Sequence, residues 1–419
     1  MRSTTTDPDA IELRSALERN LRLFPRYKAA SNLLPWLPVF FLYFIERVSL
    51  GDAVLLSSAY YLAVFFLEVP SGYYSDRCGR RPTLLLAACM ALLASATFIF
   101  ASSLPVLLLA QVFLGASIAF QSGSDSALLY DTLYALDRQH EYTERETAAQ
   151  KWSMLGLAFS GLLGGALGSI DLRLAYVAAW LAAAVVVVLC FKFVEPPVQG
   201  DDRANGFAMQ MKDTLGYFMH PLLGWILLFY AIGFFLQHIP YEFYQPYLKL
   251  ASQGAVDGWL APNSTPLVSG VLISISMFGG ALGAAVSQPL LQQLGLRTLL
   301  LVSISVQIGI IAGLSLALHP AMLLLVMLRN FSMSMAHGPM LGAIAPHVSS
   351  AQRASFLSVL SLFGRATFAL LLALLSALVI GEESLNWAAL SRVLMVSASF
   401  GLCALVLLSV YSRRLRHEF

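Results

Sequence analysis

The sequence predicts an all-α membrane protein with twelve transmembrane helices arranged in two six-helix bundles. Of its 419 residues, 58% are hydrophobic and only 12% are charged, whereas soluble domains carry about 25% charged residues. The mean hydropathy is +0.71. Long apolar runs recur along the chain, and from Pro82 to Ser124 no Asp, Glu, Lys or Arg occurs. Because a spanning helix needs about 20 such residues, we expect a protein that crosses the membrane many times.

Residues 1–30 are polar and basic and are predicted to form a cytoplasmic N-terminal tail. Asp7-Pro8 is typical of a helix start, and apolar residues then recur at helical spacing. This pattern fits an amphipathic helix on the inner membrane surface, and a solvated tail fits equally well. The first long apolar run begins only at Leu33 and lacks a small-residue cleavage site, so no cleavable signal peptide is expected. The residues at helical spacing are Leu13, Leu17, Leu21 and Phe24.

The apolar runs fall into two groups of six separated by a hydrophilic linker. The predicted N-terminal bundle covers 31–194, with helices near 32–50, 53–74, 82–101, 105–130, 149–170 and 173–194. The linker is placed at 195–216, where prolines and charged residues concentrate. The predicted C-terminal bundle covers 217–412, with helices near 217–247, 266–292, 297–317, 320–345, 354–379 and 388–411. Residues 413–419 are expected to form a short cytoplasmic tail.

The distribution of lysine and arginine predicts the orientation of the helices. Most of these residues fall in the N-terminal tail, the turn between helices 2 and 3, the loop between helices 4 and 5, the linker and the C-terminal tail. By the positive-inside rule, these segments are cytoplasmic. We therefore expect both termini on the cytoplasmic side of a plasma, or inner, membrane. The basic residues near the opposite side are Arg47, Arg173, Lys249 and Arg392.

A charged turn separates the second and third predicted helices, with the sequence Gly72-Tyr-Tyr-Ser-Asp76-Arg77-Cys-Gly79-Arg80-Arg81. Such a turn between two membrane-length apolar runs is typical of a cytoplasmic hairpin. The pattern resembles the G-x-x-x-D-R-x-G-R-R signature of the major facilitator superfamily. Any positive-inside loop would explain the arginines, but not both glycines and the aspartate at these spacings.

A weaker copy of this turn, Leu291-Gln-Gln-Leu-Gly295-Leu-Arg297, lies between helices 8 and 9. When Gly79 is matched to Gly295, Arg81 falls on Arg297. The resemblance implies two six-helix halves related by an axis along the membrane normal.

The resemblance also implies a role for the charged turn in alternating access. Gly72 and Asp76 would meet the start of helix 11, near Arg353, when the inner side is shut, and Arg77 and Arg80 would complete that charge network. A static anchor that fixes topology is the alternative. Glu68, one turn deeper in helix 2, is either a proton-titrating carboxylate or a further member of the charge network.

Several charged or titratable residues are predicted to lie inside the membrane, where they are costly and therefore candidates for function. Arg329 and Arg365 lie well inside helices 10 and 11. In one interpretation the arginines bind an anionic substrate and a carboxylate loads the coupling proton. In the other they only neutralise carboxylates as structural pairs. The resemblance implies that helices 1, 4, 7 and 10 line the central cavity, and the candidate partners on helices 1 and 7 are Glu46, His238 and Glu242.

Helix 5 carries a small-residue stretch that resembles the glycine pattern of antiporters in the superfamily, without its proline. A packing face explains this stretch almost as well. Helix 4 has Gln111 where the antiporter pattern has arginine, which departs from the usual arginine-assisted proton step. His337 and the aromatic side chains of helix 7 fit packing roles. The glycines of the helix 5 stretch are Gly156, Gly161, Gly164 and Gly165.

Motifs of soluble enzymes are absent from the sequence, including a phosphate-cradling lysine loop, G-x-S-x-G and H-E-x-x-H. No catalytic residue, metal, cofactor or nucleic-acid partner is expected, and the four cysteines are interpreted as packing residues. We expect a monomeric secondary transporter that works by alternating access and exports a small organic or amphipathic compound in exchange for protons. The alternatives are a proton-coupled importer of an organic anion and a transport-inactive membrane sensor.

Overall fold

The computed structural model describes residues 8–197, 216–254, 264–344, 346–348, 350–379, 382 and 385–415. Within these ranges all regular secondary structure is helical. Eight of the helices in the described chain are long and apolar enough to cross a membrane. Most of the predicted linker at 195–216 and the end of the tail at 413–419 lie outside the described residues.

The Cα positions divide the chain into two compact units, described separately below. Unit 1 comprises Met1–Leu37 and Ala63–Ala204, and unit 2 comprises Pro38–Leu62 and Asn205–Phe419. The division passes through one helix, α3 (Leu50–Cys78), whose first part belongs to unit 2. The segment Pro38–Leu62, which the sequence places with the N-terminal bundle, therefore has most of its contacts with unit 2.

Unit 1 is built from helices that follow the predicted ranges closely, except at the fourth. The predicted helix 105–130 is divided into α5 and α6, because Gly123 adopts a left-handed conformation with φ of 75°. A glycine has no Cβ to oppose that conformation. Besides the later part of α3, the elements are α1 (Pro8–Ser31), α4 (Arg80–Phe100), α5 (Leu104–Gln121), α6 (Ser124–Ala135), η1 (Gln139–Glu141), α7 (Tyr142–Gly168) and α8 (Leu172–Lys192).

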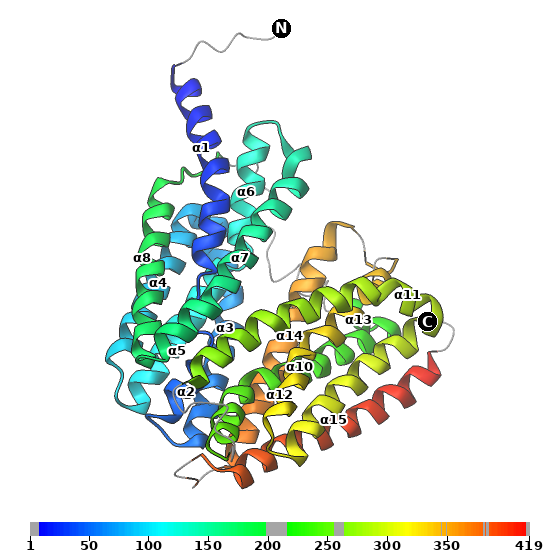
Figure 1. Cartoon of the computed structure of the whole chain (residues 1–419). Coiled ribbons are helices and arrows are strands. Elements are labelled where there is room, and N and C mark those ends of the chain that lie inside the picture. The colour runs from blue at the N-terminus through cyan, green and yellow to red at the C-terminus, as the bar shows by residue number, and fades with distance from the viewer. Residues whose placement is uncertain are drawn as a thin grey trace. The chain divides into compact units, whose positions relative to one another are not determined.

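Helix α1 differs from the tail expected at 1–30. It packs along α7 and α8 (Figure 1), and its apolar face is part of the core of unit 1. Leu17, Leu21, Phe24 and Tyr27 are each at most 4% exposed in a cluster that includes Leu133 and Cys190. The amphipathic pattern is therefore real, but the apolar face of α1 meets protein and not lipid headgroups.

A break separates α1 from the short helix α2 (Phe40–Ile45). Pro35 and Pro38 lie in this break and lack the N–H that a continuing helix needs. The free groups at the end of α1 are satisfied by side chains instead. Asn32 Nδ2 donates to the carbonyl of Lys28 at 3.0 Å, and the N–H of Leu34 donates to Ser160 Oγ of α7 at 2.6 Å.

Unit 2 contains the first part of α3, α2 and the C-terminal helices. The predicted helices 266–292 and 297–317 form one continuous element, α11, with a kink at Gly295, whose φ is 73°. The predicted helix at 320–345 begins as a 3-10 turn and a short helix before α13. The remaining elements are α10 (Pro221–Gly254), α11 (Thr265–Leu316), η4 (Pro320–Met322), α12 (Leu323–Met327), α13 (Arg329–Ile344), α14 (Ser350–Ala377) and α15 (Trp387–Arg414).

The two turns matched in the sequence have the same construction in their own units. Gly79 and Gly295 both have positive φ, at 104° and 73°. Arg81 donates to the carbonyls of Cys190 and Phe191 at the end of α8. Arg297 donates to Ser412 Oγ and to the carbonyl of Ser409 at the end of α15. Each arginine thus joins its turn to the last helix of its own unit, where free carbonyls favour a cation.

Candidate functional site

The charged turn of unit 1 is held by a network of ion pairs centred on Arg80. Its Nη1 lies 2.7 Å from Asp76 Oδ1, and its Nε lies 3.1 Å from Asp131 Oδ2 of α6. Nη1 also donates to Ser75 Oγ at 2.8 Å. One guanidinium therefore joins the end of α3 to α6. Arg77, in contrast, is exposed and lies over the ring of Tyr73 at 5.0 Å from the centroid.

Glu195, which follows α8, completes this turn and was not singled out from the sequence. Its two carboxylate oxygens accept hydrogen bonds from the backbone N–H groups of Arg80 and Arg81, each at 2.7 Å. These are the first N–H groups of α4, so the carboxylate caps the helix and interacts favourably with its dipole. A Cβ at Gly79 would lie 2.7 Å from that carboxylate. Because Glu195 lies in the predicted linker, more than a hundred residues along the chain, local sequence gives no signal for this contact.

Gly72 and Glu68 lie on the same helix as this turn. A Cβ at Gly72 would meet nothing within 4 Å, so the close helix approach expected there is not present in this structure of the described residues. Ser122 Oγ, at the break between α5 and α6, donates to Glu68 Oε1 at 3.2 Å. Arg353 lies in α14, but its side chain is outside the part of the chain that the structure describes.

A second polar centre lies inside unit 2, around Glu242 of α10. Glu242 is 1% exposed, and its Oε1 accepts a hydrogen bond from Tyr61 of α3 at 3.2 Å. Its Oε2 and the Oγ of neighbouring Ser57 are also buried, and neither has a partner in hydrogen-bond geometry among the described residues. A buried carboxylate oxygen without a donor is costly when ionised, so this group is suited to binding a proton.

Arg329, at the first turn of α13, is the cation of this centre. It is 8% exposed, and its guanidinium lies 4.8 Å from the centroid of the Tyr241 ring. Its charge also acts on Glu242, Tyr61 and Tyr244. Within the described chain, no carboxylate lies within the 4.0 Å of a salt bridge to it. The aromatic face stabilises the cation and leaves its N–H donors free for an anionic group.

His238 lies one turn before Glu242 and is enclosed by rings. It stacks on Phe234 with centroids 3.9 Å apart, and its Nδ1 lies 2.8 Å from the Phe234 carbonyl. Tyr61 and Phe368 also contact the ring, at 6.0 and 5.2 Å between centroids. The imidazole is thus fixed in place, with one nitrogen already used.

The remaining predicted path residues lie at different distances from this centre. Arg365 of α14 acts electrostatically on both Tyr230 and His238, and α14 approaches α10 closely because a Cβ at Gly364 would lie 2.9 Å from Tyr230. Glu46, after α2, forms an ion pair with Arg47 at 3.7 Å, with 47% of its side chain exposed. The structure therefore groups His238, Glu242 and Arg329, with Arg365 beside them.

The polar centre also holds the start of α2. The side chain of Gln245 accepts hydrogen bonds from the N–H groups of Phe41 and Leu42 at 2.9 and 3.2 Å. Its Nε2 donates to the Tyr244 hydroxyl at 3.1 Å. The sequence analysis did not single out Gln245, because one glutamine in an aromatic helix gives no pattern that distinguishes a cap from a surface residue.

The small-residue stretch of helix 5 lies against α1. A Cβ at Gly156 would collide with the carbonyl of Ala29, and Gly161, Gly164 and Gly165 are buried. Ser160, which stands where the antiporter pattern has glycine, accepts the N–H of Leu34. In unit 1 this stretch therefore has a packing role at the broken first helix.

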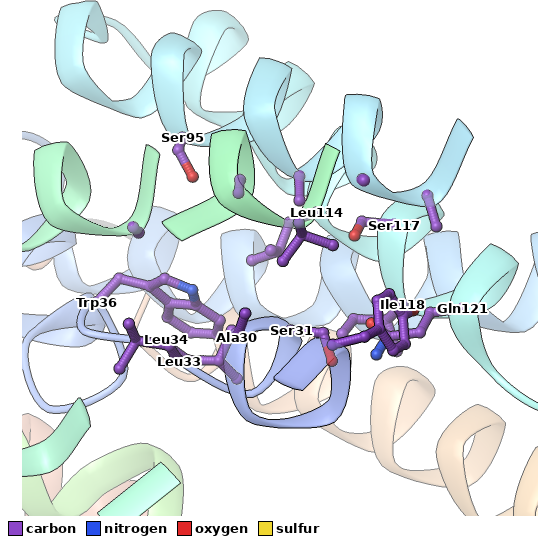
Figure 2. A pocket seen from close by; sticks show the side chains of 17 residues that line it. Ala30, Ser31, Leu33, Leu34, Trp36, Ser95, Leu114, Ser117, Ile118 and Gln121 are labelled. Atoms are coloured by element: carbon purple, nitrogen blue, oxygen red, sulfur yellow. The ribbon is translucent and has the colours of Figure 1, made fainter. Parts of the chain in front are cut away.

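A small cavity lies in unit 1 beside the break after α1. About 50 Å³ of it could be occupied by water, which is room for a few molecules but not for an organic compound. Figure 2 shows Leu33, Leu34 and Trp36 on one side and Ser95 and Ser117 on the other. Among the described residues no group of three or more His, Cys, Asp or Glu side chains could hold a metal ion.

Many spanning helices with buried charged groups, and the construction of the charged turn, define a multi-pass membrane protein of the transporter class. The chain belongs to the Major Facilitator Superfamily, whose sequence profile matches residues 24–370. The superfamily resemblance and the prediction of a transporter, not an enzyme, are confirmed. Members of this superfamily act on small-molecule substrates in the membrane.

Individual relatives are distant. The chain is 26% identical to the class E tetracycline resistance protein of Escherichia coli over 212 residues. This match covers 48% of the present chain and about half, 49%, of that curated relative. Among solved structures, the nucleoside transporter NupG has a TM-score of 0.74 at 13% identity, over 95% of this chain and 99% of its own. A peptide transporter of the POT family has a TM-score of 0.72 at 12% identity, over 94% and 97%. These structures show that the fold is shared.

Proposed function

We propose that this protein is a proton-coupled exporter of a small organic or amphipathic compound, working by alternating access as a monomer. In this proposal the twelve predicted helices form two six-helix bundles in the plasma, or inner, membrane, with both termini cytoplasmic. The energy comes from the proton gradient. Export is supported by the likeness to a tetracycline resistance protein.

The observation that carries the proposal is the buried centre of Glu242, Tyr61 and Arg329 in unit 2. Glu242 has one donor and one free oxygen, so a proton can enter without breaking an ion pair. When Glu242 is ionised, its charge is opposed by Arg329. When it is protonated, the field of the arginine is released for another group. Proton binding and substrate binding can therefore compete through one charge balance, as antiport requires.

The test is transport by the full chain in proteoliposomes with an imposed pH gradient, with tetracycline as the first probe. We expect tetracycline to move against the proton flux in wild type, and Glu242→Gln to lose gradient-driven movement to background. Glu46→Gln, which removes a carboxylate paired with Arg47 near the start of α3, is the matched control and should transport normally. If Glu242→Gln remains fully gradient-driven, Glu242 does not carry the coupling proton. If wild type moves no probe with protons, the exporter proposal fails.

The importer of an organic anion is a second candidate because the buried cation of Arg329 has an aromatic face beside it and no salt bridge within the described chain. Its first probes are a nucleoside and a dipeptide, uridine and dialanine, with benzoate as a simple anion. Import of benzoate with protons that is lost in Arg329→Gln would favour this candidate over export.

We further propose that the Gly72–Arg81 turn, with Glu68 and Arg353, is a latch that breaks and reforms during alternating access. The network of Arg80 with Asp76 and Asp131 supports this role, because a single guanidinium would have to change partners for the turn to move. Arg77, exposed on the same turn, would join the network when the inner side shuts.

A further inference from the structure

Three charged side chains meet inside unit 1 at a place that the proposed function does not use. Lys28 of α1 lies 2.8 Å from Asp125 Oδ2 of α6 and 3.7 Å from Glu146 Oε1 of α7. The side chains of Lys28 and Asp125 are each 10% exposed, and that of Glu146 is 25% exposed. Charged groups this deep in a membrane protein are costly, so the cluster calls for an explanation beyond packing.

The cluster contains one cation and two carboxylates, and only one carboxylate is fully paired. Asp125 uses both oxygens, accepting from Lys28 and from the N–H of Ser126. Glu146 accepts from Ser126 Oγ at 3.0 Å through Oε1, while its buried Oε2 has no hydrogen-bond partner among the described residues. The excess negative charge therefore resides on Glu146, and one proton added to Oε2 would make the cluster neutral.

The other titratable groups around the cluster do not supply that neutralising charge. Tyr142 of α7 interacts with Glu146 and Asp125, and Tyr27 of α1 faces Asp125. From α8, Cys190 faces Tyr27. All three are neutral acids, so Lys28 is the cation that balances the two carboxylates.

Water and mobile backbone are both close to this cluster. Lys28 lies between Tyr27 and Ser31, which line the small cavity together with Gln121. Asp125 lies two residues after Gly123, where α5 ends and α6 begins. Discontinuous helices are a recurring way to build ion sites in transporters, and here the breaks of two helices flank the same charges.

Helix α6 links the cluster to the charged turn. Asp125, near its start, pairs with Lys28, and the adjacent Ser124 donates to Ser75 of α3 at 3.1 Å. Asp131, further along α6, pairs with Arg80 of the turn. A change of charge at Lys28 therefore acts on the same twelve-residue helix that holds Arg80.

We propose that Glu146 is a proton-accepting site in unit 1, built on the Lys28–Asp125 ion pair and connected through α6 to the Gly72–Arg81 turn. A proton from water adds to Glu146 Oε2, and the net charge of the cluster changes from −1 to zero. The attraction that draws Lys28 toward Glu146 is removed, so Lys28 pairs with Asp125 alone. This site is separate from Glu242 and rests on the proposed function only in taking the proton as the coupling ion.

The test is an infrared pH titration of the full-length protein in lipid nanodiscs, which needs no substrate. On acidification, wild type should show a carboxylic acid band that is missing in Glu146→Gln and present in Asp131→Asn, the control at the other end of α6. Lys28→Gln keeps every carboxylate and removes only the cation, so it should move the band to higher pH. If Glu146→Gln titrates like wild type, or Lys28→Gln leaves the band unmoved, the proposal is wrong and the cluster is a static clamp.

The link to the turn has its own measurement. Cys78 and Cys403 are both exposed, and Cys78 lies in the turn, so maleimide labelling of Cys78 relative to Cys403 reports on it. We expect this ratio to change with pH in wild type and to be constant in Glu146→Gln. A ratio with the same pH dependence in both proteins would contradict the link through α6. Because neither readout uses transport, a Glu146 that titrates while no compound moves with protons would overturn the proposed function and leave this site standing.

Discussion

The two matched turns of the molecule share a framework and differ in their charges. Both have a glycine at positive φ and an arginine bound to the end of the last helix of their unit. The turn of unit 1 adds Asp76, Arg80 and the carboxylate of Glu195, whereas the corresponding positions of unit 2 hold Gln292 and Leu296. Since unit 2 makes its turn without these charges, glycine and arginine are sufficient for folding. The added charges are therefore the part of the turn available for function.

The largest effect is expected from removing a charge that only unit 1 has. Asp76→Asn should lower the transport rate by about tenfold or more, since coupling between conformational states is typically 1–3 kcal/mol. It should leave thermal stability nearly unchanged, because Asp76 is exposed and exposed pairs contribute little. Gln292→Asn in unit 2 is the control. Unchanged transport and an unchanged inward/outward population in Asp76→Asn would leave the turn as a static anchor.

The glycines test the shared framework and should have the next largest effect. Gly79→Ala combines a positive φ with a contact of 2.7 Å to Glu195, and should lower the free energy of unfolding by about 1–3 kcal/mol. Gly295→Ala meets nothing within 4 Å and should cost less, about 1 kcal/mol. Gly72→Ala, in a regular helix with open space around it, is the matched control. Thermal unfolding in detergent would contradict this order if Gly295→Ala were the most damaging of the three.

The two arginines should be equivalent if the framework is shared. Arg81→Gln and Arg297→Gln each remove hydrogen bonds from a cation to a helix end, and each should destabilise its unit by about 1–2 kcal/mol. Limited proteolysis at rising temperature would measure this for each unit. A loss confined to one variant would show that the turns only look alike.

The smallest effect is expected at a charge group outside both turns. Hydrogen bonds from Arg138 and then Arg145 lower the pKa of Glu141 from 4.5 to about 2. Its folded-state pKa lies below the unfolded value, so its contribution to stability is present above about pH 4.5 and is lost as the pH falls toward about 2. The difference in denaturation midpoint between wild type and Glu141→Gln should shrink over that range. A difference that grows on acidification would contradict the assignment.

The sequence by itself determined the class of protein and the placement of the turns. Apolar length is a local property, since each spanning helix satisfies its own backbone hydrogen bonds, and most predicted ranges therefore lie on observed helices. The Gly79 and Gly295 turns were found for the same reason, because a glycine at positive φ followed by an arginine is encoded within a few residues.

Only the tertiary structure decided which distant side chains share a charge. Lys28 was read as part of a basic tail and Asp125 as part of a helix end, yet they form a buried ion pair. Glu195 was assigned to a linker and caps α4, and Arg329 lies beside Tyr241 while Glu46 pairs with Arg47. The cost of a buried charge depends on what surrounds it in space, and helical periodicity fixes only the face of the helix on which a residue lies. The partner across that face is chosen by packing.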